Sequence, residues 1–92
     1  MVIVFDRQKS EANRTARGLP FDVALDLDWE TALVRLSKAQ EVTATRFVAL
    51  GVIRSVVHVL VFTLEGGDCR VLSLRRAKAK ERQRWHDAQI RS

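Results

Sequence analysis

The fold is decided by two neighbouring stretches of the chain, RFVALGVI at residues 46–53 and VVHVLVFTL at residues 56–64. Both are rich in β-branched and aromatic side chains, which is typical of β-strands. The short break at Arg54 and Ser55 predicts a tight hairpin between them. Because residues 56–62 are nearly all apolar, we expect the second strand to be a central one, covered on both faces.

The residues around this hairpin extend the sheet. Downstream, the turn sequence Glu65-Gly66-Gly67-Asp68 leads into a predicted strand over residues 69–74 and a predicted helix over residues 77–90. Upstream, residues 31–37 indicate a further strand, and the polar residues 38–44 indicate a connection. The sequence therefore predicts four strands in a meander, followed by a helix.

The N-terminal part of the chain has the pattern of a strand followed by a helix. Residues 2–5 form a short apolar run that predicts a strand. Asp6 is a good N-cap, and the polar stretch 7–17 stops at Gly18, two residues before Pro20. We therefore expect a helix over residues 7–17.

Residues 21–30 allow two interpretations. Apolar side chains occupy every second position from Phe21 to Trp29, and this period of two favours a strand. A helical spacing is also present from Phe21 to Asp28, and Pro20 suits the first turn of a helix. Periodicity by itself favours the strand.

Length and composition bound the class of protein. Ninety-two residues fit one domain spanning residues 1–92, and 47% apolar with 29% charged residues is typical of a globular protein. No apolar run approaches the ~18 residues that a membrane span needs, and the N-terminus lacks a basic signal-peptide head. The single cysteine, Cys69, cannot form an internal disulfide. We therefore expect a cytoplasmic protein that is held together by packing alone.

The net charge of +5 comes entirely from the C-terminal part of the chain. Residues 1–65 hold eight Lys/Arg and eight Asp/Glu, whereas residues 66–92 hold eight Lys/Arg against three Asp/Glu, a difference of five. A local cationic field of this kind attracts phosphate polyanions or an acidic partner segment. The alternative is a solvated basic helix that only keeps the protein soluble.

The most informative segment for chemistry is residues 70–85, RVLSLRRAKAKERQRW. Its arginines stand where the predicted last strand leads into the predicted last helix, and a helix N-terminus adds partial positive charge and free N–H groups. Such a junction is suited to binding a phosphate and stabilising a pentacovalent transition state. The alternative is that these arginines cover the sheet and pair with Asp26, Asp28 or Glu81.

Other kinds of site have little support in the sequence. Gly66-Gly67 lacks the Lys-Ser/Thr of a phosphate loop, and the two histidines and Cys69 lack metal-ligand spacing, so we expect neither a metal site nor a cofactor. His58 lies in the most apolar strand and is expected to be packed, with a general-base role as the alternative. Cys69 is expected to be packed as well, and Trp29 and Trp85 to cover the core rather than stack on bases.

The chain resembles the BrnT toxins of bacterial type II toxin–antitoxin systems, which are ribonucleases with a RelE-like fold. The resemblance covers about residues 3–85 and is carried by six stretches in the same order and spacing: FDRQKSEAN from residue 5, GLPF from 18, LDLDWETALV from 25, RFVALG from 46, VHVLVFT from 57 and RVLSLRRAKAKER from 70. It implies an α+β fold of order β-α-α-β-β-β-β-α, with an antiparallel sheet flanked by helices. It also implies that residues 21–27 form a short helix, and we follow the family there.

The resemblance further implies a metal-independent endoribonuclease, in which the RNA 2′-hydroxyl attacks the adjacent phosphate and leaves a 2′,3′-cyclic phosphate. The protein then has to orient the RNA, help move protons and neutralise the phosphorane. On this basis we expect Arg70, Arg75 and Lys78 to contact the phosphate and Glu81 or His58 to transfer a proton. The expected RNA-binding residues are Arg17, Arg46, Arg76 and Lys80.

The chain departs from the family pattern at two positions. The Lys-His-Gly that commonly precedes the second helix is Ala16-Arg17-Gly18 here, and a tyrosine often found near the end of the last helix is Trp85. An arginine is a poor base at neutral pH, although it can bind phosphate. The alternative function is therefore a non-catalytic RNA- or antitoxin-binding module that keeps the fold. A structural protein with a solvated basic helix is the third hypothesis.

A partner follows from the same resemblance. It implies a BrnA-like antitoxin whose ribbon-helix-helix part binds operator DNA, in an assembly of two toxins and two antitoxins. We expect the chain to reach operator DNA only through this antitoxin, and to have no membrane partner.

Overall fold

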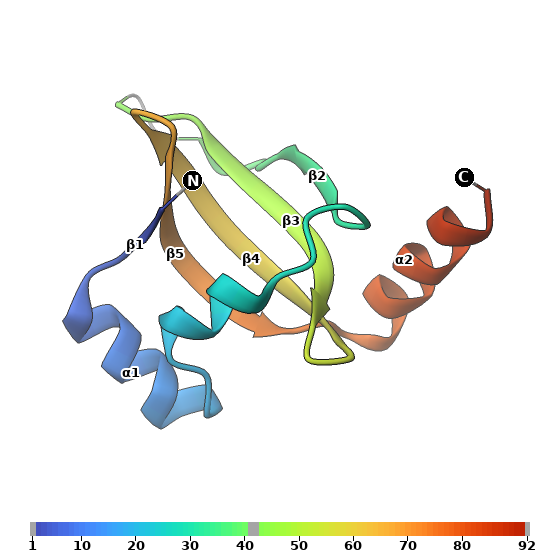
Figure 1. Cartoon of the computed structure of the whole chain (residues 1–92), viewed down its shortest axis with the longest axis horizontal. Coiled ribbons are helices and arrows are strands. Elements are labelled where there is room, and N and C mark those ends of the chain that lie inside the picture. The colour runs from blue at the N-terminus through green and yellow to red at the C-terminus, as the bar shows by residue number, and fades with distance from the viewer. Residues whose placement is uncertain (1, 41–42, 92) are drawn as a thin grey trace.

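The computed structural model describes residues 2–40 and 43–91, which form a five-stranded sheet with two α-helices and one 3₁₀-helix (Figure 1). The elements in chain order are β1 (Ile3–Val4), α1 (Arg7–Arg17), η1 (Phe21–Asp26), β2 (Leu33–Leu36), β3 (Arg46–Ile53), β4 (Val56–Glu65), β5 (Asp68–Arg76) and α2 (Ala79–Arg91). This α+β order confirms the predicted one and is consistent with a RelE-like fold. Part of the predicted connection over 38–44, residues 41 and 42, lies outside the described residues.

The sheet has the strand order β1-β5-β4-β3-β2, and its last four strands form the predicted antiparallel meander. Arg54 and Ser55 both have positive φ, at 49° and 71°, as a tight two-residue hairpin turn requires. The sheet is antiparallel, as expected, except at one edge, where β1 pairs with β5 in parallel. The chain between β1 and β5 is long enough to cross over the sheet, so a parallel neighbour is possible there.

Helix α1 begins and ends where the sequence predicts. The Asp6 carboxylate accepts hydrogen bonds from the backbone N–H groups of Gln8 and Lys9, at 2.7 and 3.2 Å. Gly18 ends the helix with a φ of 71°, which an L side chain rarely adopts. Asn13 then ties α1 to the sheet, because its Nδ2 donates to the backbone oxygens of Leu19 and Leu74.

The strand that the alternating pattern favoured at residues 21–29 does not form. Phe21–Asp26 is a 3₁₀-helix, as the family resemblance implied, and the chain buries Phe21, Ala24 and Leu27 at the three-residue spacing of that helix. Leu25, which the alternation would place among the buried residues, is 66% exposed. Gly51 makes room for this segment: a Cβ there would lie 2.9 Å from Leu27 Cδ1.

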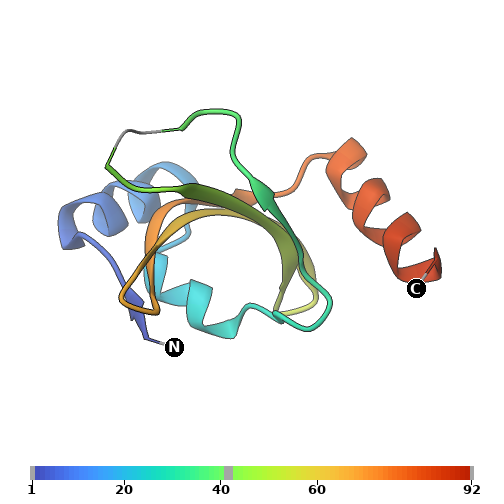
Figure 2. The same cartoon turned by 90° about the horizontal axis from the view of Figure 1, so that it is seen from above.

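The two faces of the sheet have separate clusters of apolar side chains. Figure 2 shows that the sheet curves around η1, and we call the face toward η1 the inner face and the opposite one the outer face. The larger cluster lies on the inner face and joins buried residues of η1 to Ile53, Leu60 and Leu74. The smaller cluster lies on the outer face, where Trp85 of α2 packs against it.

A β-bulge in β5 determines which of its side chains reach the outer face. Phe62 pairs with Val71 and Val61 pairs with Ser73, so Leu72 is an extra residue in β5. In a regular strand, residues an odd number of positions apart face opposite sides. Because of the bulge, Arg70 and Arg75 lie on the same face, although they are five residues apart.

Helix α2 stands beside the sheet rather than over it (Figures 1 and 2). Trp85 Nε1 and Gln89 Nε2 both donate to the backbone oxygen of Thr31, at 3.0 Å each. The outer face between α1 and α2 is therefore left open. None of the helices in the part of the chain that the structure describes is long and apolar enough to cross a membrane.

Candidate functional site

The most polar part of the outer face is at the end of the sheet where β3 begins. Arg46, Thr63 and Arg70 stand side by side on β3, β4 and β5, because the strand register pairs Arg46 with Thr63 and Thr63 with Arg70. Lys9 reaches the same place from α1. Together these residues line a cavity of about 580 Å³, which we call the sheet-end cavity and whose other lining residues are Ser37, Ala39, Thr43, Ala44, Val61, Glu65, Leu72 and Ser73.

Arg70 carries one ion pair and keeps further donors. Its Nε donates to Glu65 Oε1 at 2.8 Å, and the side chains of Arg70 and Glu65 are 39% and 48% exposed. The two terminal nitrogens of Arg70 make no hydrogen bond to any residue that the structure describes. The guanidinium can therefore hold a phosphate oxygen while it stays bound to Glu65.

Arg75 is placed differently, at the start of α2. Its two terminal nitrogens donate to the two carboxylate oxygens of Glu81, both at 2.8 Å, and Glu81 Oε1 also accepts the backbone N–H of Lys78 at 2.8 Å. The hydrogen bonds from Arg75 are the main reason why the pKa of Glu81 is lowered to about 2. Glu81 is therefore an ionised, weakly basic group that ties α2 to β5.

Replacing Glu81 with glutamine should destabilise the fold at neutral pH, by about 1.5–3 kcal/mol for the lost charged hydrogen bonds. Because the pKa of Glu81 is lowered in the folded state, its contribution is present above the unfolded pKa of about 4.5 and is lost as pH falls toward about 2. Urea unfolding of both proteins from pH 7 to pH 2 measures this difference, which should shrink in acid.

Glu11→Gln is the matched control for this experiment. Glu11 also pairs with an arginine, Arg14, but both side chains are more than half exposed. Solvent screening leaves such a pair little effect on stability. A gap between wild type and Glu81→Gln that is constant with pH would contradict the assignment.

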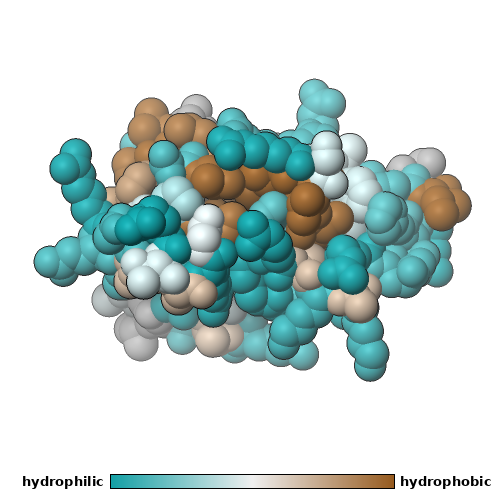
Figure 3. Space-filling model, turned by 90° about the horizontal axis from the view of Figure 1, so that it is seen from below, coloured by the Kyte–Doolittle hydropathy of each residue, from teal (hydrophilic) through white to brown (hydrophobic). Residues whose placement is uncertain are grey.

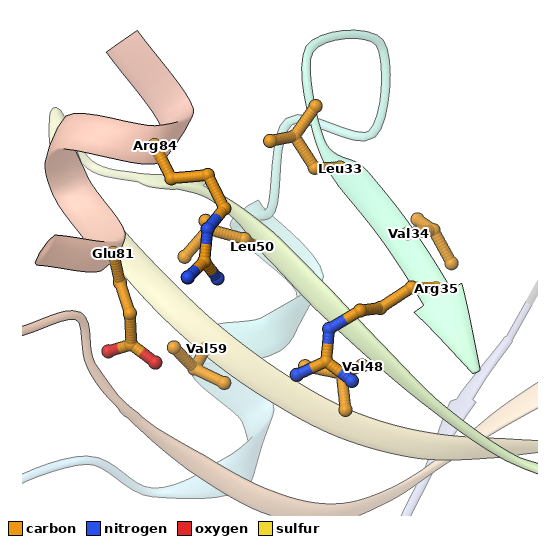
Figure 4. A pocket seen from close by; sticks show the side chains of 8 residues that line it. All are labelled: Leu33, Val34, Arg35, Val48, Leu50, Val59, Glu81 and Arg84. Atoms are coloured by element: carbon orange, nitrogen blue, oxygen red, sulfur yellow. The ribbon is translucent and has the colours of Figure 1, made fainter. Parts of the chain in front are cut away.

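A second cavity of the outer face lies between β2 and α2. It has a volume of about 290 Å³, and we call it the helix-side cavity. Figure 4 shows the side chains of Val48, Leu50 and Val59 beneath the guanidinium groups of Arg35 and Arg84, with the Glu81 carboxylate to one side. Leu33 and Val34 complete its lining.

Arg76 and His58 lie together at a corner of the inner face, whereas the Arg17 side chain lines a cavity with Lys9, Leu72 and Ser73. Arg76 pairs with His58 across the strands, and its Nη1 donates to the backbone oxygen of Arg17 at 3.2 Å. His58 is buried, and its Nδ1 lies 2.7 Å from the backbone oxygen of Val56. Burial lowers the pKa of His58, which keeps the imidazole neutral. The expectation of a packed histidine is confirmed.

The expected convergence of arginines at the strand–helix junction does not occur. Arg75 and Arg76 are neighbours in a strand, so they face opposite sides of the sheet. Arg70 and Arg75 share a face, but the rows of Thr63 and Val59 to which they belong are about 13 Å apart along the strands. The terminal nitrogens of Arg75 are bound to Glu81, whereas Arg70 Nε is bound to Glu65, so the two guanidinium groups do not converge.

Of the other expected site residues, Arg46 lies beside Arg70 in the sheet-end cavity, whereas Lys78 precedes α2 and Lys80 is exposed within it. The sequence did not indicate four charged side chains that line the two cavities: Lys9, Arg35, Glu65 and Arg84. The charge count gave no reason to expect Lys9 and Arg35 in a phosphate site, because residues 1–65 have no net charge.

The remaining candidates from the sequence are packed, as expected. Burial raises the pKa of the Cys69 thiol to about 11. Trp29 contacts Phe62 edge to face at 5.4 Å, and Trp85 packs in the outer-face cluster. Among the described residues, no group of three or more His, Cys, Asp or Glu side chains is placed to hold a metal ion.

These features define a small α+β domain with a cationic, open sheet face. Comparison with known families identifies its class further: residues 5–81 match the family described as the ribonuclease toxin, BrnT, of type II toxin–antitoxin systems. The chain belongs to this family and is a ribonuclease toxin, as the resemblance indicated. A type II toxin has a cognate antitoxin as its partner. No curated protein matches the chain significantly.

Proposed function

We propose that this toxin cleaves RNA in the sheet-end cavity by attack of the RNA 2′-hydroxyl, without a metal ion. The observation that carries the proposal is the meeting of three cations from three separate elements, Lys9, Arg46 and Arg70, in one cavity of the outer face. A site of this charge attracts the RNA backbone and stabilises the additional negative charge of a phosphorane. The activity belongs in the cytoplasm, where cellular RNA is found.

The reaction forms a bond from the 2′-oxygen to phosphorus and breaks the bond to the 5′-oxygen of the next nucleotide. Arg70 holds the phosphate through its free terminal nitrogens, and Arg46 and Lys9 add positive charge around it. Glu65, bound to Arg70 at 2.8 Å, is a carboxylate of this cavity that can accept the 2′-hydroxyl proton. The ammonium group of Lys9 can return a proton to the leaving oxygen.

The other expected residues take supporting roles in this proposal. Arg75, Lys78 and Lys80 attract phosphates that lie further along the RNA, toward α2. Glu81 does not transfer protons but positions Arg75 and α2. Arg76, at the inner-face corner, can reach only RNA that extends past the end of the sheet. Arg17 lines a cavity that shares Lys9, Leu72 and Ser73 with the sheet-end cavity, so it can hold a phosphate beside it.

The proposal is tested with the purified toxin and a short RNA of defined sequence in EDTA. Mass analysis should find 2′,3′-cyclic phosphate ends at a cleavage point, and a single 2′-deoxy substitution at that point should abolish cleavage there. Because the 2′-oxygen is the nucleophile, its removal leaves nothing to attack the phosphate. A parallel reaction on ribosome-bound messenger RNA tests whether cleavage requires the ribosome.

Intact RNA in both reactions would contradict the proposal and favour the non-catalytic binding module. Linear 3′-phosphate ends from the earliest time point would contradict 2′-hydroxyl attack while leaving ribonuclease activity intact. Cleavage that survives the 2′-deoxy substitution would do the same.

For the partner, we propose a BrnA-like antitoxin with a ribbon-helix-helix part that binds operator DNA, in a complex of two toxins and two antitoxins. The surface leaves room for such a partner: Figure 3 shows apolar surface on the side of η1 and at the end of α2, where Ile90 is 84% exposed. Operator DNA should be shifted in a gel by the complex only, and a shift by free toxin would contradict this assignment.

A further inference from the structure

The helix-side cavity has the composition of a binding site for a small planar group. Its floor consists of the apolar side chains of Val48, Leu50 and Val59, and polar groups stand only at its rim (Figure 4). Ligand sites commonly combine an apolar lining with a few polar groups that fix orientation. A volume of about 290 Å³ suits one ring system rather than a segment of folded protein.

The polar groups at the rim are two arginines and one carboxylate. Arg84 makes no hydrogen bond to any residue that the structure describes, and the guanidinium of Arg35 donates only to the backbone oxygen of Leu36, at 3.0 Å. Glu81 Oε2 accepts one hydrogen bond, from Arg75, and keeps a lone pair. The cavity therefore offers several unused donors and one unused acceptor.

The helix-side cavity lies next to the sheet-end cavity, because Val48 of the first pairs with Val61 of the second. The row of Arg35, Val48 and Val61 follows the row of Arg46 and Thr63 on the same face, two residues further along the strands, or about 7 Å. A strand of RNA whose phosphate lies at Arg46 and Arg70 can therefore place a neighbouring base over Val48.

We propose that the helix-side cavity binds an RNA base next to the cleaved phosphate and selects guanine. The inference rests on the proposed function. Arginine has donors only, and a guanidinium matches the two adjacent acceptors of guanine, N7 and O6. The guanine amino group can donate a hydrogen bond to the Glu81 carboxylate. Adenine presents a donor beside N7, so it lacks the pair of acceptors that an arginine fork requires.

Binding is measured separately from cleavage, with short oligonucleotides that carry 2′-O-methyl groups and cannot react. The probes are uridine heptamers with G, A, C or U at the central position. Wild type should bind the G probe about 5- to 100-fold more tightly than the others. Arg84→Gln should bring the four affinities within about twofold of one another, because the arginine fork is lost.

The matched control is Arg91→Gln, which removes the same charge from the exposed end of α2, outside the cavity. It should keep the preference for G and weaken all probes equally. Thermal unfolding of both variants shows whether the fold is kept.

Each result has a defined meaning. Equal binding of the four probes by a wild type that cleaves RNA would overturn the guanine site and leave the proposed function intact. A preference for G that survives Arg84→Gln would also overturn it. If Arg84→Gln weakens only the toxin–antitoxin complex, the cavity is an antitoxin surface and the inference is wrong. A wild type that neither binds nor cleaves RNA would overturn both proposals.

Discussion

Replacing Arg70 with alanine should lower the rate of RNA cleavage by about 10²- to 10³-fold, the loss typical of removing one group that stabilises a developing oxyanion. In the sheet-end cavity, Arg70 Nε is bound to Glu65, and the two terminal nitrogens of Arg70 make no hydrogen bond to described residues. The measurement is a single-turnover rate in EDTA with the toxin in excess over RNA. Arg70→Lys should recover only part of the rate, because an ammonium group lacks the planar fork.

Arg91→Gln again serves as the control, since it lowers the net charge equally without touching either cavity. Arg70 is partly exposed, so its loss should change the melting temperature little. A cleavage rate for Arg70→Ala within about twofold of wild type would move the reaction centre away from the sheet-end cavity.

Replacing Glu65 with glutamine should lower the cleavage rate by about 10²- to 10⁴-fold, the usual contribution of a general base. The amide oxygen of glutamine can still accept the hydrogen bond from Arg70 Nε, so the geometry is kept while the basic group is lost. Removing a negative charge near the phosphate should also leave RNA binding unchanged or tighter. Single-turnover rates and affinities for 2′-O-methyl RNA, both measured on the same variant, distinguish the loss of cleavage from the change in RNA binding.

The control for Glu65 is Glu11→Gln, which removes an exposed carboxylate of α1 that is also paired with an arginine. It should change neither rate nor affinity appreciably. If Glu65→Gln weakened RNA binding and the rate to the same extent, Glu65 would be a group that orders Arg70 and not the proton acceptor. A rate equal to wild type would leave the proton transfer to another group.

Most of the fold could be predicted because strands, tight turns and helix ends depend on residues that are close together in the sequence. Residues 46–64 are mostly apolar and contain one short break, so they predict a single tight turn. Asp6 and Gly18 are residues that favour the start and the end of a helix, so they predict both ends of α1. The alternation at residues 21–29 misled because a 3₁₀-helix buries every third residue, and Gly51, which is distant in the sequence, provides the space for Leu27. No local pattern contains that contact.

The candidate site was predicted less well, for reasons of geometry. The sequence drew attention to the basic C-terminal segment, and Arg70 and Arg46 do line one cavity. Lys9 comes from a segment without excess charge, and only the tertiary fold brings it to Arg70. Glu65 lies five residues from Arg70 across the predicted turn, where the charge count gave no reason to consider it. Arg75 and Arg76 are adjacent in the sequence, yet the pleat of the strand sends them to opposite surfaces.

The extra residue at Leu72 has a consequence for how β5 tolerates change. A strand alternates between two surfaces, so each inserted or deleted residue exchanges the surfaces for everything beyond it. The bulge changes this outcome in β5, because loss of Leu72 would leave Arg70 and Arg75 four positions apart in a regular strand and therefore still on the same face. Point substitutions at Leu72 leave the phase unchanged. We therefore expect β5 to tolerate the loss of one residue at the bulge, which would remove the local bend and leave Leu74 and Arg75 on their present faces.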